Sequence, residues 1–135
     1  MMLLRGALIY LASTVSLRDC GNPNSDQATI TNMGFTPSNP LPGDNTTLWV
    51  AYNLKTPITG GTATYSVTLN GIPFTPTVDD LCTQTICPKS VGSYNETSSS
   101  LFPNSISGKI VSKIQWTDQD NLPVWCLEST FKTNE

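Results

Sequence analysis

The chain has four cysteines and no histidine, so its thiols are the side chains with the widest chemical repertoire. Cys82 and Cys87 are separated by four residues, and Pro88 follows directly. Cys20 lies near the start of the chain and Cys126 near its end. This spacing is poor for a zinc site of four thiolates. Cysteines of an oxidising compartment are instead expected to form disulfides, for which three connectivities exist.

Paired carboxylates are the other potential source of chemistry, since two acidic side chains can act as general acid and base. Asp79 and Asp80 are adjacent, and adjacent residues of a strand point to opposite faces, so they do not form such a pair. The run 118–121, with Asp118 and Asp120, is typical of a solvated turn and lacks the full pattern of a calcium loop. Without histidine, Ser-His-Asp and Cys-His catalysis are excluded. The sequence therefore predicts a non-enzyme with no catalytic residue, metal site or cofactor.

Length and charge restrict the range of partners. The 135 residues suit one domain, and we expect a monomer. The formal net charge is -3, and only 13% of the residues are charged. A nucleic-acid binder needs a clustered basic surface, so nucleic acid is not an expected partner. Strong electrostatic attachment to an anionic membrane is disfavoured for the same reason.

The first 17 residues are typical of a secretory signal peptide. Arg5 provides a positive charge, an apolar run begins at residue 6, and residues 12–16 offer small side chains for cleavage. The apolar run is shorter than the ~20 residues that a transmembrane helix needs. We therefore predict a signal peptide over residues 1–17 and one domain over residues 18–135. The protein would be secreted or would lie in the endolysosomal lumen.

The remaining segments have the pattern of a β protein. Apolar and polar residues alternate in short stretches that turns separate, and no stretch has a convincing helical period. The serine-rich stretch 90–102 would be an edge strand or two short strands. The expected strands cover residues 28–35, 46–54, 62–70, 90–102, 106–116 and 122–131. This series predicts an all-β, immunoglobulin-like sandwich of two antiparallel sheets.

Each expected strand has one apolar face. In residues 46–54, for example, Leu48, Val50 and Tyr52 share one face, while Trp49 lies on the other. The simplest arrangement packs the apolar faces of the two sheets together, about 10 Å apart, as a filled core. Alternation alone favours such a filled core over a ligand cavity.

Several short motifs, taken in order, resemble the ML-domain lipid-recognition family. Its signature is similar to residues 80–82 (Asp-Leu-Cys), the four-residue gap and residues 87–88 (Cys-Pro). The resemblance continues through the Gly-x-Pro segment 71–76, the long strand 110–116 that ends in an aromatic residue, and a last strand with a cysteine. It begins with the Asp-Cys-Gly run 19–21. The family includes the secreted Niemann–Pick sterol carrier and phosphatidylglycerol/phosphatidylinositol transfer proteins.

With this resemblance in view, we predict the disulfides Cys20–Cys126 and Cys82–Cys87. The first would tie the two ends of the domain together and close a loop of roughly 100 residues, which is worth about 4 kcal/mol in the chain-entropy model. The second would fix the shape of a small loop. ML proteins commonly contain a further disulfide near the first strands, which this chain lacks.

The resemblance also implies a lipid-binding cavity, because in the ML family the two sheets splay at one end and leave an apolar space. By analogy, this space is lined by the inward residues Val50, Tyr52, Leu54, Tyr65, Val67, Leu69, Ile110, Ile114 and Trp116. Its mouth would lie beside the Cys82–Cys87 loop and contain Phe74, Val91, Tyr94 and Phe102. Lys89, next to this mouth, would either meet a lipid phosphate or be an ordinary solvated lysine.

The implied function is a secreted lipid-binding or transfer protein that holds a sterol or phospholipid between its sheets and touches membranes transiently. The alternative is a secreted recognition module that presents a lipid to a protein receptor or binds the receptor itself. Asn45 and Asn95 each begin an Asn-x-Thr sequon, so we predict N-glycosylation at these two positions.

Overall fold

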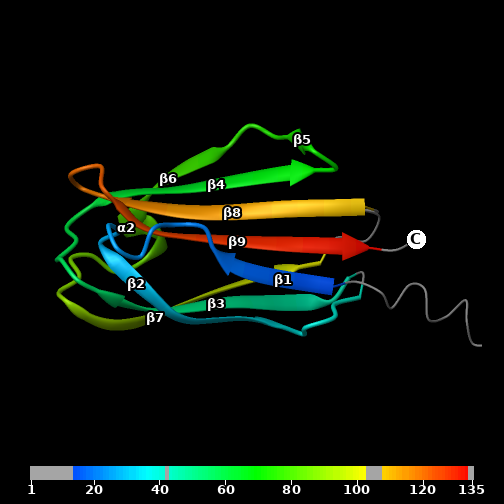
Figure 1. Ribbon diagram of the computed structural model, residues 1–135, viewed down its shortest axis with the longest axis horizontal. Coiled ribbons are helices and arrows are strands. Elements are labelled where there is room, and N and C mark those ends of the chain that lie inside the picture. Colours follow the sequence, from blue (N-terminus) through cyan, green and yellow to red (C-terminus); the bar gives the residue numbers. More distant parts are fainter. Residues whose placement is uncertain (1–13, 42, 103–107, 134–135) are drawn as a thin grey trace, which may run out of the picture.

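The computed structural model describes residues 14–41, 43–102 and 108–133, which form two facing layers of strands (Figure 1). Residues 1–13 of the predicted signal peptide and the predicted strand start at Ile106 lie outside the described residues. All strand pairs are antiparallel. The predicted all-β sandwich of two antiparallel sheets is confirmed.

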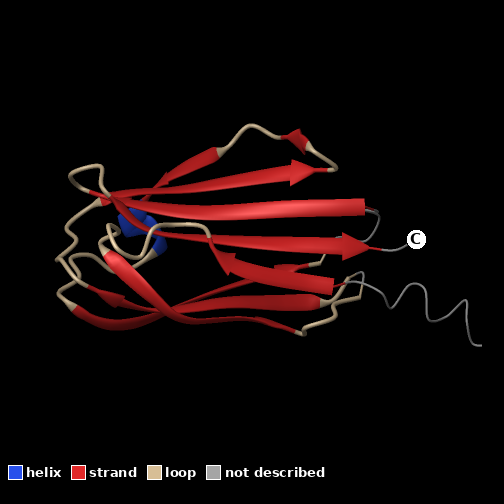
Figure 2. Ribbon diagram, viewed as in Figure 1, coloured by secondary structure: helices blue, strands red, loops and turns tan. Residues whose placement is uncertain are grey.

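The two sheets differ in size (Figure 2). The smaller sheet has the order β2 (Ala28–Thr36), β3 (Asn45–Leu54) and β7 (Gly92–Leu101). The larger sheet has the order β1 (Thr14–Asp19), β9 (Pro123–Thr133), β8 (Gly108–Asp118), β4 (Gly61–Leu69) and β5 (Ile72–Pro73), and β6 (Thr77–Asp80) also pairs with β4. The one-turn helix α2 (Leu81–Gln84) packs against β4, β6 and β8 at one end of the sandwich.

Alternating burial along the strands shows why these residues form a sandwich. In β3, Val50, Tyr52 and Leu54 are buried between the sheets, whereas Asn53 is exposed. This is the face that the sequence predicts. The serine-rich stretch forms one continuous edge strand, β7, which pairs with β3 from Gly92 to Leu101.

The first strand was not expected. β1 begins at Thr14, so the predicted boundary of the signal peptide at residue 17 falls within a strand. β1 pairs with β9 over its whole length, for example Val15 with Phe131 and Leu17 with Ser129. The small residues that suggest a cleavage region also have the alternation of a strand, because Val15 and Leu17 are separated by Ser16. The larger sheet therefore begins at Thr14, within the predicted signal peptide.

Helix α2 was also not expected, because a single turn is too short to show a helical period. Asp80 begins it as the N-cap, and its carboxylate accepts a hydrogen bond of 3.1 Å from the backbone N–H of Cys82. Leu81 is fully buried and anchors the turn to the core. This helix holds the start of the Cys82–Cys87 loop against the larger sheet.

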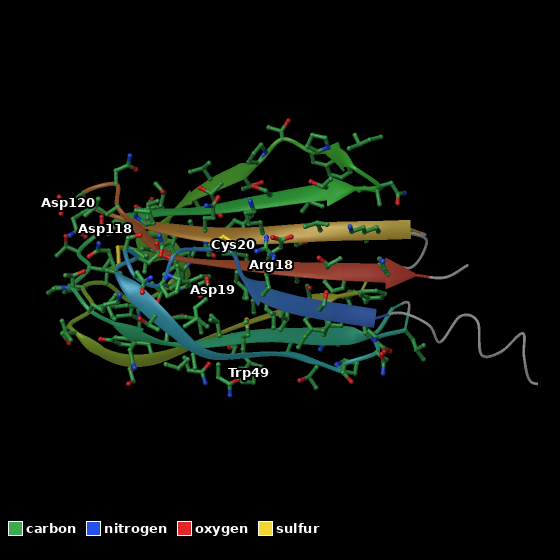
Figure 3. The ribbon with its side chains drawn as sticks, in the orientation of Figure 1. Arg18, Asp19, Cys20, Trp49, Asp118 and Asp120 are labelled. Atoms are coloured by element: carbon green, nitrogen blue, oxygen red, sulfur yellow. A yellow bond between two sulfur atoms is a disulfide. The ribbon has the colours of Figure 1, made fainter. Side chains whose placement is uncertain are left out.

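The turn between β8 and β9 has a structural carboxylate (Figure 3). Asp118 is only 5% exposed, so the prediction of a fully solvated turn is wrong at this residue. Its Oδ1 accepts hydrogen bonds from the backbone N–H groups of Asp120, at 2.9 Å, and Leu122, at 3.0 Å. A carboxylate that bonds its own backbone in this way stabilises a tight turn. Asp120, at the exposed tip, has no part in this arrangement beyond its N–H.

The outer face of the smaller sheet is shaped by Trp49, which Figure 3 shows on the side away from the larger sheet. Trp49 pairs with Gly34 across β2 and β3, and its ring covers that glycine. A Cβ atom at position 34 would lie 2.5 Å from the indole. Glycine is thus required here to let the aromatic ring lie flat on the sheet.

An aromatic cluster joins the two sheets. Tyr52 of β3 lies 6.0 Å, between ring centroids, from both Trp116 of β8 and Trp125 of β9. The two tryptophan rings are themselves 4.6 Å apart. All three are at most 4% exposed. These large rings fill the half of the sandwich that is nearer to α2.

Both predicted disulfides are present. Cys20–Cys126 links the residue after β1 to β9, where the N–H of Cys20 also donates to the carbonyl of Cys126 at 3.1 Å. Cys82–Cys87 closes the loop that follows α2. The first bridge joins residues 106 apart in sequence and the second joins residues 5 apart.

The two bridges should therefore contribute unequally to stability. Replacing Cys20 and Cys126 with alanine should lower the free energy of unfolding by about 4–5 kcal/mol, since the unfolded chain loses a long covalent loop. The same replacement of Cys82 and Cys87 should cost about 2 kcal/mol in the chain-entropy model, because the loop is short. Equilibrium urea denaturation measures both values. Equal losses from the two double variants would contradict this account.

Candidate functional site

A large cavity between the sheets lies in the half where β3 begins and β9 ends. It has a volume of about 370 Å³. Its apolar lining consists of Phe35, Leu48, Tyr65, Val67, Leu101, Phe102, Ile114, Leu127 and Phe131. Phe131 packs edge-on against Phe35 and Phe102, at 5.4 and 5.6 Å between ring centroids. We call this space the main cavity.

Small residues explain why this half of the sandwich is hollow. The cavity-facing positions of the edge strand β7 hold Ser98 and Ser100, which are both exposed, while β8 contributes Ser112 and β9 contributes Ser129. Sheets packed face to face lie about 10 Å apart, a space that large interdigitating side chains normally fill. Serine side chains do not fill it, whereas the rings of Tyr52 and its neighbours do so in the other half. The four serines, which we call the serine layer, thus create the cavity.

A second cavity of about 110 Å³ adjoins the main one. We call it the side cavity. The two share Leu48, Tyr65, Ser98, Ile114 and Leu127. The further lining of the side cavity includes Val50, Gln84, Glu96, Thr97, Trp116 and Trp125. A hydrogen bond of 2.9 Å from the Tyr65 hydroxyl to Oε1 of Gln84 links β4 to α2 at its edge. The two cavities are therefore neighbours, and the side cavity has the more polar lining.

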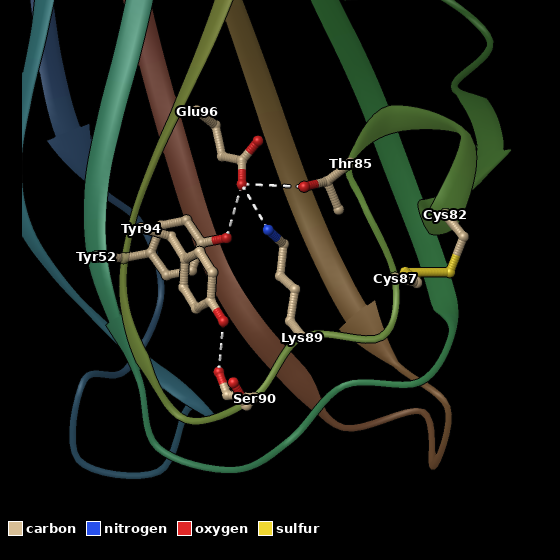
Figure 4. Close-up of polar contacts among 8 residues, drawn as sticks. All are labelled: Tyr52, Cys82, Thr85, Cys87, Lys89, Ser90, Tyr94 and Glu96. Atoms are coloured by element: carbon tan, nitrogen blue, oxygen red, sulfur yellow. Dashed lines mark hydrogen bonds and ion pairs between the residues drawn. A yellow bond between two sulfur atoms is a disulfide. The ribbon is translucent and has the colours of Figure 1, made fainter.

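Glu96 is the centre of a polar network beside this cavity (Figure 4). Its Oε2 accepts hydrogen bonds from the hydroxyls of Tyr52, at 2.9 Å, and Thr85, at 3.1 Å. The same oxygen lies 3.3 Å from Nζ of Lys89. Burial, followed by the Glu96 charge, raises the pKa of Tyr52 well above its ordinary value, so its hydroxyl remains a donor. The network ties the Cys82–Cys87 loop to the smaller sheet.

Lys89 has neither of the two predicted roles. Its side chain is only 7% exposed, and Nζ lies over the ring of Tyr94 at 4.1 Å from the centroid, besides pairing with Glu96. Its backbone N–H donates to the carbonyl of Ile58 at 2.8 Å. A lysine held in this way is a structural cation that faces neither solvent nor an entering phosphate.

The region predicted as the mouth is filled by side chains. The ring of Tyr94 stacks on Tyr52 at 5.7 Å, and its hydroxyl donates to the carbonyl of Ser90 at 2.7 Å. Phe74 and Val91 are exposed on loops and do not line either cavity. Phe102 follows the far end of β7 and lines the main cavity there. The main cavity thus lies in the half of the sandwich away from the Cys82–Cys87 loop.

The structure brings only some of the other predicted lining residues together. Tyr65, Val67 and Ile114 line the main cavity, and Val50 and Trp116 line the side cavity. Tyr52 and Leu54 are buried in the filled core, whereas Ile110, near the start of β8, is buried outside it and lines neither cavity. Leu69, which pairs with Ile110, is not among the lining residues. Alternation predicts which side chains of a strand point between the sheets. It does not predict which of them pack in the filled core and which line a cavity.

Several lining residues were missed. Leu48 lies on the predicted inward face of β3, so it could have been included. Trp125, Leu127 and Phe131 share one face of β9 by simple alternation, so they could have been included as well. The inward serines give no such signal, because alternating polar residues are normally taken to face solvent. Their position follows only from the register of β7, β8 and β9.

Comparison with known proteins now identifies the family. The family model described as ML domain matches residues 14–133, which is nearly the whole described chain and includes β1. The chain belongs to the ML domain family. The sequence-based assignment is thus confirmed. ML domains form a non-enzymatic lipid-transfer family, as the absence of a catalytic pair in the sequence had suggested.

Relatives of this ML domain are distant. A Dictyostelium discoideum protein named phosphatidylglycerol/phosphatidylinositol transfer protein 1 is 29% identical over 119 residues, which cover 85% of this chain and 78% of the relative. A second Dictyostelium discoideum protein with the same kind of name is 26% identical over 126 residues, covering 90% and 89%. These similarities extend over most of the domain.

Solved structures share the fold. A Niemann-Pick type C2 protein from the Japanese carpenter ant superimposes with a TM-score of 0.64 at 11% identity, covering 85% of this chain and 96% of that one. Chicken MD-1, in complex with lipid IVa, gives a TM-score of 0.62 at 18% identity and 90% coverage of both chains. The ML fold is therefore retained at low sequence identity.

The described part of the ML domain contains neither a group of metal ligands nor a membrane-spanning helix. Within residues 14–41, 43–102 and 108–133, His, Cys, Asp and Glu side chains form no group of three that could hold a metal ion. The same residues include no helix with the length and apolar character that crossing a membrane requires.

Breaking the ion pair of Glu96 should be costly, because Lys89 would remain buried without its counter-charge. Glu96→Gln should lower the free energy of unfolding by about 3 kcal/mol. Glu128→Gln is the matched control, since Glu128 pairs at 2.6 Å with Arg18, whose side chain is 66% exposed. That surface pair should contribute at most about 1 kcal/mol. Urea denaturation of both variants tests the difference, and similar losses would show that the Glu96 network is not buried in the folded protein.

Proposed function

We propose that this ML domain binds the apolar part of a lipid in the main cavity and carries the lipid between membranes. The observation that carries the proposal is the apolar cavity of about 370 Å³ between the sheets. Small-molecule sites typically measure about 300–1,000 Å³ and are mainly apolar. Each methylene group that leaves water for such a space contributes about 0.8 kcal/mol, so a hydrocarbon tail can bind with few polar contacts.

A phospholipid is the cargo that the relatives favour. The Dictyostelium discoideum proteins are named for the transfer of phosphatidylglycerol and phosphatidylinositol, and they align with most of this chain. The MD-1 structure contains lipid IVa, so the shared fold can accommodate acyl chains. The aromatic cluster and the Cys82–Cys87 loop keep the sandwich rigid beside the cavity. A preformed site of this kind lowers the ordering cost of binding.

We also propose that the protein works outside the cytosol, either secreted or in the endolysosomal lumen. The two disulfides support this location, because such bonds persist in oxidising compartments. A signal peptide would then be cleaved before Thr14, since β1 belongs to the folded domain. Asn45 and Asn95 are both exposed, as N-glycosylation requires.

Filling the main cavity should abolish cargo binding. Val67 lines the cavity, and Val67→Trp would occupy space that the lipid tail needs. Losing the burial of two methylene groups would alone weaken binding about tenfold. The control is Thr68→Trp, because Thr68 is the next residue of β4 and does not line either cavity.

The measurement is native mass spectrometry of the purified protein after incubation with vesicles of phosphatidylglycerol. Wild type and Thr68→Trp should each retain one lipid, whereas Val67→Trp should not. Wild-type protein that binds no lipid under these conditions would refute the proposed function. Equal retention by both variants would place the lipid outside the main cavity.

A further inference from the structure

The side cavity contains a buried hydrogen-bond donor without an acceptor. Among the described residues, Nε1 of Trp125 is the buried side-chain polar atom that has no hydrogen-bond partner. The residue is 4% exposed, and its ring packs against Trp116 and Tyr52. Leaving a buried donor unpaired costs about 1–3 kcal/mol, so native proteins rarely do so without a reason. Because Trp125 lines the side cavity, a ligand atom there can supply the acceptor.

The side cavity also contains an acceptor that is not fully used. The hydroxyls of Tyr52 and Thr85 and the ammonium group of Lys89 all contact Oε2 of Glu96. Oε1 of the same carboxylate makes no such contact with the described residues (Figure 4). A carboxylate oxygen can accept further hydrogen bonds when donors reach it. Glu96 lines the side cavity and is thus available to a ligand there.

A donor and an acceptor that line one small cavity match a hydroxyl group, which both accepts and donates a hydrogen bond. We propose that the side cavity recognises a free hydroxyl at the polar end of the bound lipid, through Nε1 of Trp125 and Oε1 of Glu96. This inference rests on the proposed function, since it assumes that the apolar part of the lipid occupies the main cavity. The hydroxyl can come from a polyol headgroup of a phospholipid or from a sterol.

Two other polar groups fit the side cavity less well. A phosphate would meet the Glu96 carboxylate, and the nearby cation, Lys89, is already paired with that carboxylate. A quaternary ammonium group would face aromatic rings, which attract cations. It would nevertheless leave the Trp125 donor unpaired, because it has no acceptor atom. The negative charge of Glu96 is also already compensated by Lys89. The observed groups therefore favour a neutral hydroxyl.

The test compares lipids that differ in the hydroxyl alone. Phosphatidylglycerol and phosphatidylethanol with identical acyl chains have the same charge, but only the first has hydroxyls in its headgroup. Cholesterol and its methyl ether form the second pair. Phosphatidylcholine is the fifth lipid and tests recognition of a quaternary ammonium group. Competitive binding by native mass spectrometry should favour the hydroxyl member of at least one pair about fivefold, the contribution of one net hydrogen bond. The pair that shows the preference identifies the source of the hydroxyl.

Trp125→Phe removes the indole N–H and keeps an aromatic ring, so it should reduce the preference to less than about twofold. Trp116→Phe is the matched control, because Trp116 lines the same cavity and packs on the same rings but is not the unpaired donor. It should weaken both members of a pair alike and keep their ratio. NMR of the wild-type protein gives a second readout that needs no variant. The indole N–H resonance of Trp125 should shift downfield when the lipid with the hydroxyl binds and should not shift when the lipid without it binds.

Three results would overturn the inference. Equal binding of both members of each pair would show that no hydroxyl is recognised. A preference for phosphatidylcholine would assign the side cavity to a cation. Equal loss of preference in Trp125→Phe and Trp116→Phe would assign the effect to packing. By contrast, wild-type protein that binds none of the five lipids would refute the proposed function and this inference together.

Discussion

The contact of Tyr52 with Trp116 and Trp125 is the interaction on which the rest of the structure depends. These three rings come from both sheets and fill the space between them over one half of the sandwich. Aromatic pairs contribute about 0.5–1.5 kcal/mol beyond the burial of their area, so the cluster fixes the sheets firmly in this half. Because the rings fix the spacing between the two sheets, the other half can remain hollow without the sheets separating or collapsing.

The polar network around Glu96 supports this arrangement. Tyr52 belongs to both the aromatic cluster and the network, so the ring position and the carboxylate position are coupled. The network also fixes Thr85 and Lys89 on either side of Cys87, which orients the loop that the short disulfide closes. One carboxylate therefore connects the loop, the core and the wall of the side cavity.

Much of the fold could be predicted from the sequence, because alternation and turn residues are local signals. The inward face of β3 and the edge position of β7 both follow from such signals. The disulfide pairing and the cavity needed the family resemblance. The rest of the fold depends on contacts between segments far apart in the sequence or on different elements. β1 has the composition of a signal-peptide end, and only its pairing with β9 makes it a strand. Lys89 is buried because it pairs with Glu96, seven residues later on β7. The sequence placed the cavity mouth beside the Cys82–Cys87 loop, whereas the main cavity lies in the other half of the sandwich, because inward serines leave no apolar pattern.

Under the proposed function, the serine layer affects how quickly a lipid can leave the main cavity. Hydroxyl groups on the cavity wall can hydrogen-bond water, so a cavity that has released its lipid can be hydrated, unlike one lined by hydrocarbon alone. Hydration lowers the free energy of the empty state and hence the difference between the empty and loaded states. A carrier with such a wall holds its lipid less tightly and exchanges it faster than one with a fully apolar wall. Serine at these positions therefore favours turnover over storage.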